Sequence, residues 1–91
     1  MYIRGVALYQ LMTDQVSWSE VGGEIVVLNE STYYTVAGTG VVLWRLLVEG
    51  ATEAQLVDEL TSAYEVGPGT AKADVAAFLE QLVAAGMVRQ A

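Results

Sequence analysis

The sequence predicts an α+β fold in which a three-stranded antiparallel sheet precedes three helices. Two observations lead to this prediction. In the first half of the chain, short segments rich in β-branched and aromatic residues are separated by Gly and Asn turns, as in β-strands. In the second half, apolar residues recur at spacings of three and four, as in amphipathic helices. The chain has 91 residues, and we expect one domain over residues 1–91 with a single modest core.

Three strands are expected, at Val16–Glu20, Glu24–Leu28 and Thr32–Val36. Gly22-Gly23 separates the first two strands, because glycine accepts the positive φ angles of a tight turn. Apolar residues on both faces of Glu24–Leu28 suggest a central strand that is covered on both sides. Thr32–Val36 then lies at an edge of the sheet, unless the short apolar segment Val6–Tyr9 pairs with it.

The three helices are predicted from apolar spacing and from capping residues. The first follows Gly38-Thr39-Gly40, with Thr39 as its expected cap, and it is apolar over most of its circumference, so it should be central in the core. Thr52-Glu53-Ala54-Gln55 is a capping-box pattern that begins the second. The third is expected to be capped by Thr70 and to end at Gly86 in a left-handed conformation. Its apolar residues are Ala71, Val75, Phe78, Leu79, Leu82 and Val83. Strands followed by three short helices indicate a winged helix-turn-helix-like arrangement.

Composition and charge argue against several classes of function. The chain has no His and no Cys, so the commonest general base and the usual transition-metal ligands are missing. We therefore expect no enzymatic activity, no metal and no cofactor. The formal net charge is −7, and the basic residues are scattered, which disfavours nucleic acid and anionic membrane surfaces as partners. The absence of Cys, of a secretory signal and of a long apolar run fits a cytoplasmic protein.

Three features remain as candidates for binding. Thr32–Val36 is either a structural strand that completes the core or an edge that accepts a peptide as an added strand. Asp74 lies on the apolar stripe of the third helix, where it either meets the positive helix end or makes a polar contact at a groove. Phe78 and Leu82 are one turn apart, as are Val75 and Leu79. One of these two rows is expected to pack on the first helix, which leaves the other beside the edge strand.

The chain resembles the PqqD-like family, also called RiPP precursor peptide recognition elements, and within it the stand-alone leader-binding proteins of lasso-peptide biosynthesis. The resemblance covers about residues 5–90 and rests on the order of elements and on hydrophobic spacing. Val36-Ala37 departs from the Leu-Asn of the quinone-cofactor branch. The residues that carry the resemblance are Glu24–Asn29, Tyr33–Val36, Gly38–Gly40, Val42–Trp44, Gly50–Thr52, Asp74, Val75, Phe78, Leu79, Leu82 and Gly86–Val88.

The resemblance implies a non-catalytic protein that binds the leader of a ribosomally made precursor along its third strand, in a groove against its third helix. In lasso systems such a leader often carries a Tyr and a Pro that anchor in this groove, and the precursor is presented to a separate leader peptidase and a cyclase. Carried over to this sequence, the strand contacts are Thr32, Tyr33, Tyr34, Thr35 and Val36. The helix contacts are Ala71, Asp74, Val75, Phe78 and Leu82.

Other interpretations remain open at this stage. A PqqD-like peptide chaperone for a radical-SAM enzyme would work by the same mechanics in another pathway. A winged-helix DNA-binding protein shares the order of helices, although the third helix offers Lys72 against Asp74 and Glu80. A small catalytic domain is disfavoured by the lack of His and Cys. The sheet edge also allows a homodimer to form through the same strand.

Overall fold

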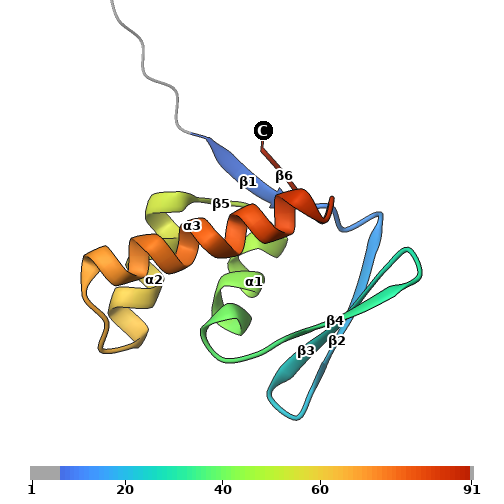
Figure 1. Cartoon of the computed structure of the whole chain (residues 1–91), viewed down its shortest axis with the longest axis horizontal. Coiled ribbons are helices and arrows are strands. Elements are labelled where there is room, and N and C mark those ends of the chain that lie inside the picture. The colour runs from blue at the N-terminus through green and yellow to red at the C-terminus, as the bar shows by residue number, and fades with distance from the viewer. Residues whose placement is uncertain (1–6, 91) are drawn as a thin grey trace, which may run out of the picture.

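The computed structural model describes residues 7–90, and its β2, β3 and β4 strands and its three helices follow the predicted order (Figure 1). The elements are β1 (Leu8–Leu11), β2 (Val16–Val21), β3 (Glu24–Asn29), β4 (Thr32–Val36), α1 (Thr39–Glu49), β5 (Ala51–Thr52), α2 (Glu53–Ala63), α3 (Pro68–Ala84) and β6 (Val88–Gln90). The predicted fold class, a three-stranded antiparallel sheet followed by three helices in a winged-helix-like arrangement, is confirmed.

The larger sheet is an antiparallel meander in the order β2-β3-β4. Its first turn is Gly22-Gly23, and both glycines have positive φ angles, of 61° and 82°, as the sequence predicted. The pairing places Val27 opposite Trp18 on one side and Tyr34 on the other. These three residues therefore share the face of the sheet that is turned toward the helices.

The central strand β3 is covered on one face rather than on both. Ile25 and Val27 are fully buried, whereas Val26 and Leu28 on the opposite face are partly exposed. The expectation of cover on both sides was wrong, because in residues 7–90 all three helices lie on one side of this sheet (Figure 1). Apolar residues on both faces of a strand do not distinguish a buried face from a partly exposed one.

A second, small sheet was not predicted. It has the order β5-β1-β6, and it joins the N-terminal strand to the segment before α2 and to the C-terminal end. Strand β1 begins at Leu8, and Val6 of the expected apolar segment lies outside the described residues. Because β1 pairs with β5 and β6, it does not cover β4. The strands of this sheet are two to four residues long, too short to give a clear alternating pattern.

The helix starts were predicted correctly for one of the three helices. Thr52 forms the expected capping box with Gln55 at the start of α2. Thr39 and Thr70 do not act as caps, because α1 is preceded by Gly38 and α3 begins two residues before Thr70, at Pro68. Proline is favoured in the first turn of a helix, since its missing N–H has no acceptor there and its φ angle is already helical.

Helix α3 ends in the left-handed turn that Gly86 predicted. Gly86 has a φ angle of 74°. Its N–H donates to the carbonyl of Val83, and the N–H of Met87 donates to the carbonyl of Leu82, which is the Schellman pattern. This turn brings Met87 back against the helix, where it is 3% exposed.

A single hydrophobic core joins residues of both sheets and all three helices. Helix α1 is central, as predicted, and buries Val41, Leu43, Trp44 and Leu47. Side chains connect the β2-β3-β4 sheet to the helices. Trp18 packs edge-on against Trp44, with ring centroids 5.9 Å apart. Arg45 donates to the carboxylate of Glu20, and the Asn29 amide donates to the carbonyl of Ala85 over 2.8 Å.

Candidate functional site

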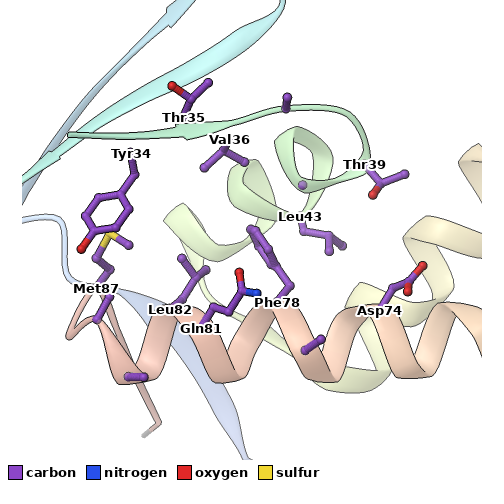
Figure 2. Close-up of a pocket in the computed structure, with 15 residues that line it drawn as sticks. Tyr34, Thr35, Val36, Thr39, Leu43, Asp74, Phe78, Gln81, Leu82 and Met87 are labelled. Atoms are coloured by element: carbon purple, nitrogen blue, oxygen red, sulfur yellow. The ribbon is translucent and has the colours of Figure 1, made fainter. Parts of the chain in front are cut away.

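A groove of about 800 Å³ lies between strand β4, the start of α1 and one face of α3 (Figure 2). This volume lies within the range of pockets that hold small ligands or several side chains of a peptide. The groove is lined by Tyr34, Thr35, Val36, Ala37, Thr39, Gly40, Leu43, Asp74, Ala77, Phe78, Gln81, Leu82, Ala84, Ala85 and Met87.

The base of the groove is formed by buried apolar side chains and its walls by partly exposed ones. Leu43, Leu82 and Met87 are 2–4% exposed, so they are fixed by the core. Val36 and Phe78 stand on opposite sides and retain some exposure. An occupant would gain by covering these side chains, at about 25 cal/mol per Å² of apolar surface.

The two ends of the groove differ in chemistry. Tyr34 and Met87 lie at one end, while Thr39 and Asp74 lie at the other (Figure 2). The Asp74 carboxylate is exposed, and Asp74 is the charged residue in the groove lining. The groove is therefore apolar along most of its length, with an acidic end.

One side of the groove is a strand edge. Strand β4 pairs with β3 along one edge, and within residues 7–90 no strand pairs with its other edge. Alternate residues of such an edge direct their N–H and C=O groups outward, where they can accept an additional strand. The apolar groove and the open strand edge thus lie side by side in the same region of the surface (Figure 2).

The structure brings six of the ten candidate residues together around the groove. These residues are Tyr34, Thr35, Val36, Asp74, Phe78 and Leu82. Thr32 and Tyr33 belong to the same strand but do not line the groove. The Tyr33 side chain is 72% exposed, and it lies on the opposite face of the sheet, beside Val26 and Leu28. Any role of Thr32 and Tyr33 in the groove is therefore limited to their backbone groups.

The expected peptide contacts at Ala71 and Val75 are corrected by the structure. Both side chains are fully buried in the core and do not line the groove. Helix α3 has two apolar faces. Val75 and Leu79 pack inside, and Leu82 of the second row is as buried as Leu79, at 4% exposed. Phe78 lies on the neighbouring face, toward β4. The sequence left open which row faces inward, since apolar spacing alone does not show where a helix meets its neighbours.

The β4–α1 connection, helix α1 and the C-terminal turn contribute groove residues that the sequence did not indicate. These residues are Ala37, Thr39, Gly40, Leu43 and Met87. Gly40 is notable because a Cβ at this position would lie 2.9 Å from Val36 Cγ1 and 3.2 Å from Phe78 Cε1. A side chain of any size would press on both walls, so the absence of a Cβ lets Val36 and Phe78 both approach the backbone of α1.

Few ionisable side chains line the groove. Its ionisable side chains are those of Tyr34 and Asp74, and neither forms a nucleophile–base pair with another lining residue. Residues 7–90 contain no group of three His, Cys, Asp or Glu residues that could hold a metal ion. In the same part of the chain, no helix is long and apolar enough to span a membrane.

Comparison with solved structures gives a similar protein over nearly the whole chain. The structure described as "TbiB1 in Complex with the TbiA(beta) Leader Peptide" matches with a TM-score of 0.80 and 27% sequence identity. The match covers 88% of this chain and 94% of the TbiB1 chain. TbiB1 is thus similar in fold and in length.

Comparison with protein families gives a match to the family described as "Coenzyme PQQ synthesis protein D (PqqD)". The matched residues are 24–88, more than half of the chain, and they include β3, β4 and all three helices. The search of curated proteins found no match. The extent of the family match and the likeness to TbiB1 agree with the resemblance noted in the sequence, and we conclude that the chain belongs to the PqqD family.

Proposed function

We propose that this protein binds the leader segment of a ribosomally synthesised precursor peptide, as in lasso-peptide biosynthesis, and has no catalytic activity of its own. The leader adds to β4 as a further antiparallel or parallel strand. Its inward side chains occupy the groove against α3. The bound precursor is then presented to a separate leader peptidase and cyclase in the cytoplasm, and residues 1–91 act as one binding domain.

The observation that carries this proposal is the open edge of β4 beside the apolar groove. A flexible peptide gains backbone hydrogen bonds from the edge and apolar burial from the groove at the same time. Ordering such a peptide costs about 2–5 kcal/mol of the gross interaction energy. Neither an edge alone nor a groove alone offers both contributions.

The likeness to TbiB1 supports the same conclusion, because that protein is described in complex with the TbiA(beta) leader peptide. The family description favours a second candidate of closely related mechanics. In that case the chain is a PqqD-like chaperone that delivers a peptide to a radical-SAM enzyme. The two candidates share the peptide site and differ in the enzyme that receives the peptide.

The test is a fluorescence anisotropy titration of the purified full chain. The probes are a labelled TbiA(beta) leader peptide and the leader of the precursor encoded beside this gene. Scrambled versions of both peptides and a DNA duplex serve as controls. We expect saturable binding of at least one leader, and no binding of its scrambled form.

A folded protein, by circular dichroism, that binds neither leader contradicts the proposal. Binding of the duplex with strong salt dependence would instead support the DNA-binding alternative. Light scattering with and without leader tests the homodimer, since a dimer through β4 must dissociate when the leader occupies that edge. Co-purification of the leader complex with the neighbouring peptidase or with a radical-SAM enzyme separates the two candidates.

A further inference from the structure

The acidic end of the groove indicates which leader residues the protein selects, an inference that rests on the proposed function. Of the 15 residues that line the groove, Asp74 is the charged one. In the part of the chain that the structure describes, the ion pair found is that of Glu20 and Arg45, and Asp74 takes part in none. Its carboxylate is exposed at the end of the groove that Thr39 also lines.

The position of Asp74 in α3 excludes the helix end as the reason for its charge. An acidic residue in the first helical turn is stabilised by the positive end of the helix. Helix α3 begins at Pro68, and its first turn contains no acidic residue. Asp74 lies in the second turn, where this effect has largely decayed. Neither the helix end nor an ion pair within residues 7–90 therefore accounts for a carboxylate here.

The geometry of α3 matches that of a strand laid along it. Asp74, Phe78 and Leu82 are each four residues apart, so they are separated by about 6 Å along the helix axis. Side chains on one face of a strand are two residues apart, or about 6.6 Å. The segment from β4 to α1 runs beside α3 (Figure 2). A strand added to β4 would therefore place successive inward side chains near successive turns of α3.

We infer that the protein prefers a leader with a Lys or Arg over Asp74. The next two inward side chains of the leader are apolar and lie against Phe78 and Leu82. The preferred segment is thus basic–x–apolar–x–apolar, where x faces away from the groove. The pattern is written from the Asp74 end of the groove toward Tyr34. In a leader that runs in the opposite direction, the same residues appear in reverse order.

The size of the effect follows from the exposure of Asp74. An ion pair at an exposed site contributes modestly, so replacing the basic leader residue by a neutral one should weaken binding about two- to fivefold. The net charge of −7 also attracts basic peptides, but without preference for position. A preference confined to one leader position separates the local contact from this general attraction.

Glu80 provides the matched control. It is an exposed carboxylate on the same helix, but it lines a different hollow, beside Tyr9 and Val83. Asp74→Asn and Glu80→Gln change the net charge by the same amount, and each retains a similar side-chain shape. A general electrostatic effect therefore predicts equal changes for the two variants, whereas a contact in the groove predicts a change for Asp74→Asn alone.

The experiment selects binders from a display library of random short peptides on the full-length wild type and on the variants Asp74→Asn, Glu80→Gln and Asp74→Lys. We expect wild type and Glu80→Gln to enrich peptides in which a basic residue is separated by two and by four positions from two apolar residues on the same side. We expect Asp74→Asn to enrich the apolar pair without the basic residue. Asp74→Lys should enrich an acidic residue at the same position. Each variant is first shown by circular dichroism to be folded.

The outcomes are distinguishable. Apolar peptides selected equally by all variants, with no charge preference, overturn this inference and leave the proposed function intact. Equal loss of basic residues with Asp74→Asn and Glu80→Gln also overturns it, in favour of general attraction. If the folded wild type selects no peptide, the proposed function fails, and this inference fails with it.

Discussion

At the scale of single residues, Gly40 lets both walls of the groove approach the backbone of α1. It lies in the first turn of α1, and both Val36 and Phe78 approach it closely. Val36 is β-branched and has little rotamer freedom, and Phe78 is held by its helix. A Cβ at position 40 therefore cannot be accommodated by moving a flexible chain end, and one of the walls has to shift.

Gly40→Ala should weaken leader binding more than it destabilises the domain. The added methyl group pushes Val36 or Phe78 into the groove, and overpacking of this kind typically costs about 1–3 kcal/mol where it is resisted. Helix propensity acts in the opposite direction, since Ala is favoured over Gly by about 1 kcal/mol within a helix. Urea denaturation and leader anisotropy measure the two effects separately. Unchanged affinity in a folded variant would show that the walls move freely.

At the scale of elements, α3 supplies both a buried row and a groove face, so its ends matter for both. The Schellman turn at Gly86 holds Met87 at the base of the groove. Gly69 is in the first turn of the same helix, and a Cβ there would meet no atom within 4 Å. Gly86 is favoured by its positive φ angle, whereas the space around Gly69 would accept a Cβ.

Gly86→Ala should lower the free energy of unfolding by about 1–2 kcal/mol, because a residue with a Cβ is disfavoured at a φ angle of 74°. Gly69→Ala is the control, and it should raise stability by up to about 1 kcal/mol through helix propensity. Urea denaturation followed by Trp fluorescence measures both. Equal effects of the two substitutions would contradict the role assigned to the turn.

Strand β4 should recognise its ligand through backbone groups. N-methylation of a leader amide that faces β4 removes a hydrogen-bond donor and adds a bulky group at the edge, so binding should fall by at least tenfold, about 1.4 kcal/mol or more. Methylation of the next amide, which faces away, should have little effect. Anisotropy with a series of singly N-methylated TbiA(beta) leader peptides reveals this alternation. A series without alternation would argue against strand addition.

At the scale of the whole molecule, the groove is lined by residues of β4, α1 and α3, so it lies where the β2-β3-β4 sheet joins the helices. The width of such a groove depends on the contacts that hold its two sides together. The hydrogen bond from Asn29 to the carbonyl of Ala85 is one of these contacts. Asn29 is opposite Thr32 at the start of β4, and Ala85 lines the groove, so this bond holds the sheet against the end of α3.

Asn29→Asp should weaken leader binding and lower stability by about 1–3 kcal/mol. The carboxylate cannot donate to the Ala85 carbonyl, which leaves two acceptors facing each other in a half-buried position. Glu30→Gln, at the exposed neighbouring turn, serves as a control that alters charge without touching this contact. Affinity and urea stability are measured for both variants. An Asn29→Asp protein with wild-type affinity would show that another contact sets the groove width.

Local sequence patterns were sufficient for the order of the three helices, the β2-β3-β4 meander, the central place of α1, the capping box at Thr52 and the left-handed turn at Gly86. Each of these depends on residues close together in the chain, such as a pair of glycines or a Thr and a Gln three residues apart. The resemblance supplied the location of the groove, and Tyr34, Val36 and Phe78 were found in its lining.

The tertiary structure decided what depends on partners distant in sequence. The face of α3 that packs inward is set largely by α2, and this packing places Val75 in the core and Phe78 in the groove. The contribution of Gly40 and Met87 follows from the way α1 and the C-terminal turn meet β4. Strands β5 and β6 are too short to show an alternating pattern in the sequence. They form because β1 provides a partner for both. A sequence states which faces are apolar, but the packing of the whole chain decides which of them remain open to a ligand.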